Sequence, residues 1–139
     1  MYQELPRPTV FAHRGSKAHA PENTLAAFKL AVSQGAPAIE LDAKLTSDGE
    51  IVVFHDQTLN RTTDGVGAIV NTSLVALKKL DAGFHFSAEF TGERIPTLAE
   101  VFETVGRQVF INVELTNYVS PRDLLPDKVT ALVVRFGLQ

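Results

Sequence analysis

The feature that most constrains the fold is a repeated alternation between short apolar strand-like runs and longer stretches with helical periodicity. The strand-like runs cover residues 9–12, 38–45, 51–54 and 109–115, and the helical stretches cover residues 25–34, 98–105 and 124–136. Strands that alternate with helices of this length are typical of a parallel sheet covered by helices. The pattern therefore predicts an α/β fold with about four strand–helix units.

The length of the chain limits how complete such a sheet can be. A closed barrel of eight parallel strands, the TIM barrel, takes about 250 residues, whereas this chain has 139. We therefore expect a TIM-barrel-like partial barrel that forms one domain over residues 1–139 and is C-terminally incomplete. Its first and fourth strands would be open hydrophobic edges. Homodimerisation, a separate C-terminal partner or a missing C-terminal half would cover these edges.

Residues 57–96 do not fit the alternation. They are rich in Thr, Gly and Asp and contain one helical patch, around residues 74–80. A segment of this length is too long for a simple loop. We expect it to form an insertion beside the barrel.

Polar side chains occur at or near the carboxyl ends of the expected strands. Alternation along residues 38–45 places two acids on one face of that strand. The full set is His13, Arg14, Glu40, Asp42, His55 and Glu114. The carboxyl ends of the strands of a parallel barrel converge on one face, where active-site groups collect. We therefore expect these six side chains to form one site.

The three carboxylates of Glu40, Asp42 and Glu114 would repel one another at such a site unless a cation lay between them. An all-oxygen ligand set favours the hard cations Mg²⁺, Ca²⁺ or Mn²⁺, so the sequence predicts a divalent metal. Arg14 could hold a phosphate oxygen by a charged hydrogen bond. Without a metal, Arg14 would be expected to form a structural ion pair with Glu40 or Asp42.

Two of the histidines, His13 and His55, follow different strands and can act as a general acid and a general base near neutral pH. Together with a metal that polarises a phosphoryl oxygen, they favour cleavage of a phosphodiester. We expect His19 and His85 to have no role, and we expect residues 22–24 mainly to cap the first helix.

Four motifs match, in order and spacing, a known family signature. They are His13-Arg14-Gly15, Pro21-Glu22-Asn23-Thr24, Glu40-Leu41-Asp42 and Val53-Phe54-His55-Asp56, and they resemble the glycerophosphodiester phosphodiesterase family. Three further motifs resemble the characteristic insertion of that family: Arg61-Thr62-Thr63-Asp64-Gly65, Leu80-Asp81-Ala82-Gly83 and Ile95-Pro96-Thr97-Leu98. The resemblance covers nearly the whole chain.

The resemblance implies metal-dependent hydrolysis of glycerophosphodiesters to an alcohol and glycerol 3-phosphate. The implied mechanism is attack by the substrate's own neighbouring hydroxyl, which gives a cyclic phosphate that water then opens. Mg²⁺ or Ca²⁺ is the implied cofactor, with Mn²⁺ as a further candidate. The implied roles are metal binding by Glu40, Asp42 and Glu114, acid–base catalysis by His13 and His55, and phosphate binding by Arg14.

One position departs from the family pattern. The family usually has a lysine two residues after the acid of the fourth strand, and this chain has Thr116 there. A second interpretation is therefore a non-catalytic half barrel that binds a metal, a phosphorylated ligand or a partner protein. A sphingomyelinase D-like phospholipase is disfavoured, because its secreted examples typically carry disulfides and this chain has no Cys.

Charge and hydropathy exclude several kinds of partner. The formal net charge of -3 provides no electrostatic footprint for nucleic acid. No segment approaches the roughly 20 apolar residues of a transmembrane helix, and the start lacks the apolar region of a signal peptide. We expect a cytoplasmic protein that acts on a small-molecule glycerophosphodiester.

Overall fold

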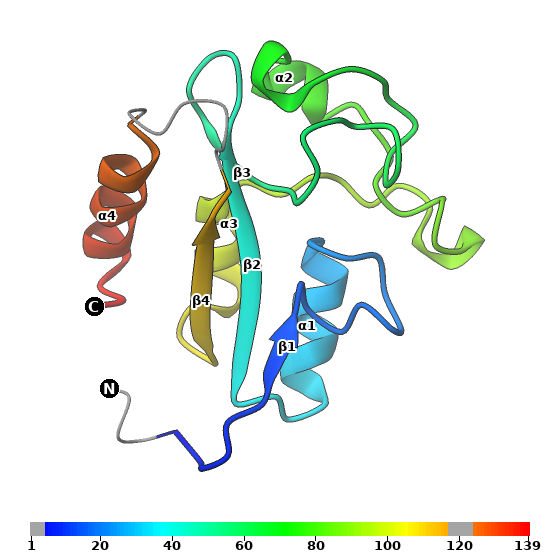
Figure 1. Cartoon of the computed structure of the whole chain (residues 1–139). Coiled ribbons are helices and arrows are strands. Elements are labelled where there is room, and N and C mark those ends of the chain that lie inside the picture. Colours follow the sequence, from blue (N-terminus) through cyan, green and yellow to red (C-terminus); the bar gives the residue numbers. More distant parts are fainter. Residues whose placement is uncertain (1–4, 117–123) are drawn as a thin grey trace.

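Strand β2 (Ala38–Leu45) is the centre of the sheet, and the three other strands all pair with it. The computed structural model describes residues 5–116 and 124–139. In it, β1 (Phe11–His13) and β4 (Phe110–Leu115) run parallel to β2 on its two sides (Figure 1). The first seven residues of β2 are buried, as expected for a central strand of a parallel sheet.

The expected parallel direction of the run 51–54 is wrong. Strand β3 (Ile51–Val53) pairs antiparallel with the end of β2, so that Ala43 lies opposite Val53. Residues 46–50 form a tight turn between the two strands, and Gly49 adopts a φ of 78° in it. So short a connection joins only antiparallel neighbours, because a parallel crossover needs a dozen or more residues. Among the described strands, β1, β2 and β4 are the parallel ones.

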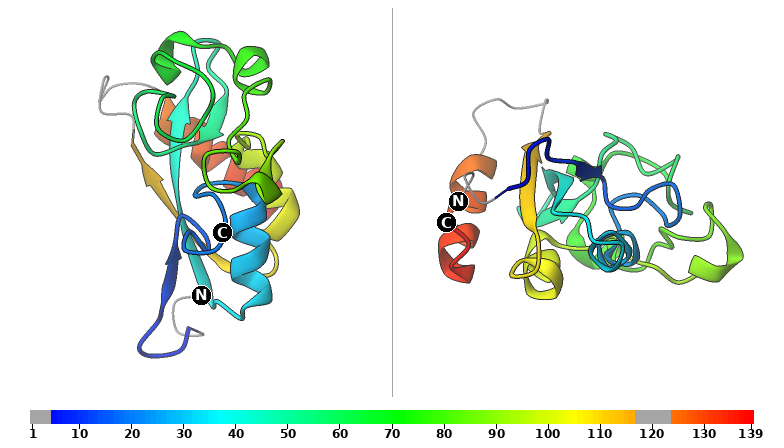
Figure 2. Two further views of the ribbon diagram at one scale, coloured as in Figure 1. Left: turned by 90° about the vertical axis from the view of Figure 1, so that its right-hand side faces the viewer. Right: turned by 90° about the horizontal axis from the view of Figure 1, so that it is seen from below.

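Helices α1 (Leu25–Ser33), α3 (Leu98–Val105) and α4 (Leu125–Phe136) confirm the three expected helical stretches. α1 and α3 pack side by side, and α4 packs beside α3 on the side of β4 (Figures 1 and 2). The main apolar core joins these helices to the sheet and includes Phe28, Ile39, Leu41, Val53, Leu98, Phe102 and Leu125. No helix in the described part of the chain is long and apolar enough to cross a membrane.

Residues 57–96 fold around a second, smaller core. They contain the short helices η2 (Ile69–Asn71), α2 (Leu74–Leu77) and η3 (Ala88–Phe90), so the helical patch is shorter than expected. The side chains of this core are Val52, Phe54, Leu59, Ile69, Leu77, Ala82 and Ile95. Because Val52 lies in β3 and Phe54 directly follows it, the core holds the segment against the β3 end of the sheet.

The sheet is not closed into a barrel. Within residues 5–116 and 124–139, β1 and β4 each pair with β2 alone. The polar side chains identified from the sequence lie at or beyond the carboxyl ends of β1 and β3, on the central strand β2 and on the edge strand β4. The fold therefore gathers the candidate site at one end of an open parallel sheet.

Candidate active site

The three carboxylates predicted as metal ligands lie together. Glu40 and Asp42 are two residues apart on β2 and therefore share one face of the sheet, while Glu114 of β4 lies opposite Asp42 in the strand register. Each residue offers one oxygen, and these oxygens all lie within 4.8 Å of one another. Glu40 and Asp42 are buried, with exposed fractions of 7% and 1%, and Glu114 is exposed. The cluster is thus rooted in the sheet and accessible from outside it.

The environment of Glu40 fits a cation ligand. Its pKa is raised by burial and by the negative charge of Asp42, and the backbone N–H of Arg14 only partly offsets these effects. The Oε1 atom of Glu40 is buried and has no hydrogen-bond partner. Buried polar atoms in folded proteins are nearly always partnered, and a carboxylate oxygen beside two further acids is the kind of ligand that Mg²⁺ and Ca²⁺ take. A divalent cation would supply the missing partner.

The backbone at the end of β1 places the next two predicted residues against Glu40. His13 pairs with Glu40 in the strand register, and its Nε2 lies 3.8 Å from Glu40 Oε2. The Nδ1 atom of His13 lies 2.8 Å from Lys17 Nζ. Arg14 has a left-handed φ of 58°, and its N–H donates both to the Glu40 carbonyl and to Glu40 Oε2, at 3.0 Å each. The sharp turn after β1 therefore directs Arg14 back over the carboxylates.

The side chain of Arg14 has a partner that the sequence-based interpretation did not anticipate. Its Nη1 donates to Glu22 Oε1 at 3.0 Å. Its Nε lies 3.4 Å from Asp42 Oδ2 without forming a hydrogen bond and is buried. An ion pair with Asp42 was one of the expected alternatives, and it is present alongside the contact with Glu22. The Nε atom of Arg14 is thus a buried donor beside Asp42 that has no hydrogen-bond partner.

Asn23 supports the acid cluster from the loop before α1. Its Nδ2 donates to Asp42 Oδ2 at 2.9 Å, and the residue is buried with a left-handed φ of 57°. Thr24 caps α1 as expected, because its hydroxyl accepts from the N–H of Ala27. The segment 22–24 therefore does more than cap the helix: two of its three side chains contact residues of the candidate site.

His55 connects to the same site through an acidic neighbour. Its Nδ1 lies 2.7 Å from Asp56 Oδ1. Arg61 donates to both oxygens of Asp56, at 2.7 and 2.8 Å. The same guanidinium donates to both oxygens of Glu22, at 3.0 and 2.7 Å. Glu22 therefore lies between two arginines, one over the carboxylates and one in the segment 57–96.

The two acids in this network are held ionised. Burial raises the pKa of Glu22, but hydrogen bonds and charge from Arg61 and then Arg14 outweigh it and lower the pKa to about 2. The hydrogen bond from Arg61 likewise holds the pKa of Asp56 well below its usual range, against an opposing effect of burial. Both carboxylates are consequently negative at neutral pH, as their paired guanidinium groups require.

A buried lysine lies beside Thr116, the position that departs from the family pattern. Lys44 of β2 donates from Nζ to the Thr116 carbonyl at 2.7 Å and to Thr116 Oγ1 at 2.9 Å. The pKa of Lys44 is lowered, because the effect of burial exceeds the opposing effect of the negative charges of Asp42, Asp56 and Glu114. An ammonium group from the neighbouring strand thus contacts the residue that stands where the family usually has a lysine.

The sequence-based prediction placed the three acids of the cluster, the two histidines and Arg14 at one site. It did not assign Glu22, Asn23, Lys44, Asp56 or Arg61 to that site. Lys44 carried a signal, because it is two residues beyond Asp42 and so shares its strand face. Arg61 lay in a motif of the resemblance, but nothing in the sequence pattern indicated its contact with a residue 39 positions earlier.

The fold and the site together define a class. Parallel strands followed by helices carry clustered carboxylates, an arginine and histidines at one end of the sheet, as in (β/α)-barrel proteins with a polar site at the carboxyl ends of the strands. The sequence profile of the glycerophosphoryl diester phosphodiesterase family matches residues 13–136. The chain belongs to this family, which confirms the resemblance found in its motifs.

Individual relatives agree with this assignment. The glycerophosphodiester phosphodiesterase of Caldanaerobacter subterraneus subsp. tengcongensis is 54% identical over 131 residues, which are 94% of this chain and 54% of that protein. The putative glycerophosphodiester phosphodiesterase YhdW of Bacillus subtilis is 47% identical over 111 residues, or 80% of this chain and 46% of its own length. The chain thus spans about half the length of the curated relatives it matches.

Solved structures confirm the fold class. A glycerophosphodiester phosphodiesterase from Agrobacterium tumefaciens superposes with a TM-score of 0.85 at 38% identity, covering 94% of this chain and 54% of that one. A phosphodiesterase from Oleispira antarctica, in complex with the product sn-glycerol-3-phosphate, gives a TM-score of 0.83 at 44% identity, covering 99% and 54%. The described part of the chain is a TIM-barrel-like partial barrel.

Proposed function

We propose that this chain carries the metal- and phosphate-binding site of a glycerophosphodiester phosphodiesterase. The reaction is hydrolysis of a glycerophosphodiester to an alcohol and glycerol 3-phosphate. The observation that carries the proposal is the cluster of three carboxylate oxygens within 4.8 Å of one another, with Arg14 and His13 both in contact with one of its members. The relative that binds sn-glycerol-3-phosphate supports the choice of substrate class.

Glu40, Asp42 and Glu114 would hold the metal, which we propose to be Mg²⁺ or Ca²⁺, with Mn²⁺ as a third candidate. All three cations favour carboxylate oxygens. When bound, the cation would polarise a phosphoryl oxygen and offset the charge that develops on the phosphate. Asn23 holds Asp42 by its Nδ2 donor and so fixes the orientation of that carboxylate.

Arg14 would bind the phosphate. Its guanidinium is anchored at Nη1 by Glu22, while Nε is buried without a hydrogen-bond partner. A phosphate oxygen would satisfy that donor, and charge-assisted bonds from arginine to phosphate are among the stronger hydrogen bonds in proteins. Arg14 would thus fix the phosphate over the carboxylates.

The hydrogen bonds of the two histidines suggest distinct roles. His55 Nδ1 faces a carboxylate, so it carries the proton, and Nε2 is free to accept one. His13 Nδ1 lies 2.8 Å from Lys17 Nζ, and donation from Nε2 would come from the imidazolium form, in which both ring nitrogens carry a proton and Lys17 no longer bonds to Nδ1. We therefore assign the general base to His55 and the general acid to His13.

In the first step, His55 Nε2 takes the proton of the glycerol hydroxyl next to the phosphoester. That hydroxyl oxygen bonds to phosphorus, the bond to the alcohol oxygen breaks, and the His13 imidazolium donates its Nε2 proton to the departing alcohol and becomes neutral. Water then opens the cyclic phosphate with the two roles reversed. Glycerol 3-phosphate and the alcohol are the products.

Hydrolysis of glycerophosphocholine by the purified chain tests this proposal. We expect release of choline and glycerol 3-phosphate that depends on added divalent metal and stops with EDTA. His13→Ala and His55→Ala should each lower turnover by at least about 100-fold with metal binding retained, and the exposed His19→Ala variant serves as the matched control. Full turnover in either of the first two variants would contradict the acid–base assignment.

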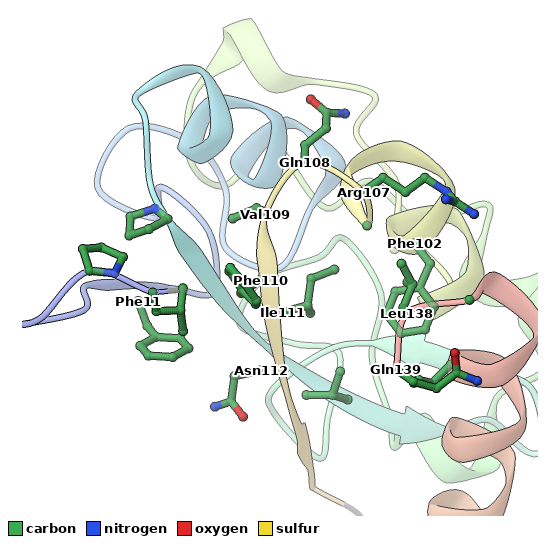
Figure 3. Close-up of a pocket in the computed structure, with 17 residues that line it drawn as sticks. Phe11, Phe102, Arg107, Gln108, Val109, Phe110, Ile111, Asn112, Leu138 and Gln139 are labelled. Atoms are coloured by element: carbon green, nitrogen blue, oxygen red, sulfur yellow. The ribbon is translucent and has the colours of Figure 1, made fainter. Parts of the chain in front are cut away.

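A non-catalytic half barrel is the second candidate, and the open edge of β4 favours it. A cavity of about 670 Å³ lies along this edge. Figure 3 shows Phe110 and Ile111 on β4 and Val109 just before it, with Phe11 to one side and Phe102 to the other. We propose that a second copy of the chain or the C-terminal half of the barrel covers this surface. A folded chain that binds metal without hydrolysing glycerophosphocholine would support this candidate. We retain a cytoplasmic location as a prediction, which cell fractionation would test.

A further inference from the structure

Arg61 joins the two arms of the candidate site. It lies in the segment 57–96 and donates hydrogen bonds to two carboxylates. One is Asp56, which contacts His55, and the other is Glu22, which accepts from Arg14. We infer that Arg61 is a positioning residue: it fixes the imidazole of His55 and the guanidinium of Arg14 relative to each other. This inference rests on the proposed function, because it assigns roles to both of those side chains.

The contacts form a continuous chain across the site. His55 Nδ1 lies 2.7 Å from Asp56 Oδ1, and Arg61 donates to both oxygens of Asp56. Arg61 also donates to both oxygens of Glu22, whose Oε1 accepts from Arg14 Nη1 at 3.0 Å. Every link between the base and the phosphate-binding arginine is therefore a hydrogen bond of ordinary length.

The geometry depends on the shape of the guanidinium. A planar fork can offer parallel N–H donors to a carboxylate on each of two sides, which the compact ammonium of a lysine cannot do. Arg61 uses all three of its nitrogens on the two acids. Its own side chain is 47% exposed, while those of Glu22 and Asp56 are 18% and 24% exposed. Arg61 therefore lies on the solvent side of the two acids that it binds.

A purely structural surface ion pair is the competing explanation, and such pairs contribute little stability. The arrangement here differs from an isolated pair because both acids are also bonded to side chains of the site. Loss of Arg61 would leave Glu22 with Arg14 as its remaining partner and would free Asp56 to rotate away from His55. The expected consequence is misplacement of two functional groups in a chain that still folds.

The test compares Arg61→Ala and Arg61→Lys with Arg94→Ala. Arg94 lies in the same segment and donates to the carbonyls of Lys79 and Leu80, so its loss is a matched control for a structural role. Three quantities are measured with Mg²⁺ present: the ¹⁵N signals of the His55 ring, the affinity for glycerol 3-phosphate, and the turnover of glycerophosphocholine. The ¹⁵N signals report which ring nitrogen carries the proton.

We expect the Arg61→Ala variant to lose the fixed Nδ1-protonated form of His55 and to bind glycerol 3-phosphate about tenfold more weakly, with turnover reduced by about 10- to 100-fold. Arg61→Lys should stay close to Arg61→Ala, and Arg94→Ala should match the unsubstituted chain. An unchanged His55 spectrum in Arg61→Ala, or equal losses in Arg61→Ala and Arg94→Ala, would overturn the inference. If the unsubstituted chain has no turnover, the proposed catalytic function fails, and the ring signals alone still decide the role of Arg61.

Discussion

At the scale of single residues, the site is a balance between buried acids and the cations that compensate them. Glu40 has a raised pKa because it is buried beside Asp42, whereas Glu22 has a lowered pKa because two arginines bind it. The charged side-chain partner of Glu40 is His13, at 3.8 Å, whereas two guanidinium groups donate hydrogen bonds to Glu22. This contrast supports the proposal that Glu40 is a metal ligand and that Glu22 orders the protein.

Glu40→Gln should stabilise the metal-free chain at neutral pH and weaken metal binding by about 100-fold. Loss of an outer-shell partner typically lowers metal affinity about 10- to 100-fold, and loss of a direct ligand should lower it at least as much. The pKa of Glu40 is raised in the folded state, so the stability linked to its protonation is present at low pH and lost as the pH rises through the folded pKa. The amide mimics the protonated acid. Thermal unfolding at pH 7 with and without Mg²⁺ checks both effects, and a variant less stable than the parent without metal would contradict them.

Glu22 should contribute stability of the opposite pH dependence. Its pKa of about 2, against an ordinary value of 4.5, means that its contribution is full above pH 4.5 and is lost as the pH falls toward 2. The shift corresponds to at most about 3.4 kcal/mol, and solvent screening of this partly exposed group makes the expected contribution smaller. Urea unfolding of Glu22→Gln at several pH values should show a lower stability at pH 7 and a flatter decline below pH 4.5. The exposed Glu103→Gln is the control, and equal profiles for the two variants would contradict the account.

At the scale of elements, local sequence signals were sufficient to predict where the three longer helices and most of the strands lie. Alternation along β2 correctly placed Glu40 and Asp42 on one face, and Thr24 and Thr97 marked the starts of α1 and α3. The direction of β3 was not predictable from its apolar run, because a buried run looks alike in parallel and antiparallel sheets. The short turn before β3 does indicate the antiparallel direction, because a parallel connection needs a dozen or more residues.

The capping box of α3 should be a measurable source of stability. The Thr97 hydroxyl accepts from the N–H of Glu100, and the Glu100 carboxylate accepts from the N–H of Thr97. Thr97→Ala removes the first of these bonds and should lower the free energy of unfolding by about 1–2 kcal/mol. Thr130→Ala, on the exposed face of α4, should change it by less than about 0.5 kcal/mol. Equal effects in urea unfolding would show that the box does not stabilise α3.

At the scale of the whole molecule, an incomplete sheet carries a site whose parts come from nearly its full length. The spacing of the motifs was sufficient to predict the acids as a group, because strand ends converge wherever parallel strands lie side by side. The Glu22–Arg61 contact was not predictable, since it depends on how two irregular segments fold over the sheet. The open β4 edge was predictable from the chain length, because 139 residues are about half of those that a closed eight-stranded barrel takes.

The open edge should make the isolated chain associate. Phe110 is partly exposed and lines the cavity along β4, and unpaired strand edges pair readily with other chains. We expect sedimentation equilibrium at micromolar concentration to give a mass above the 15.1 kDa of one chain. Phe110→Glu should shift the mass toward the monomer, whereas Val75→Glu, on the exposed side of α2, should not. A monomeric parent chain would contradict this prediction.

We propose that Glu40, Asp42, Glu114 and Arg14 form one metal-dependent phosphate site. Calorimetric titration of the chain with glycerol 3-phosphate tests it most directly, with Mg²⁺ present and then with EDTA, in the parent chain and in Glu114→Gln. We predict binding that weakens at least about tenfold when the metal or the third carboxylate is removed. Equal affinity with Mg²⁺ and with EDTA, or no binding under either condition, would contradict the account.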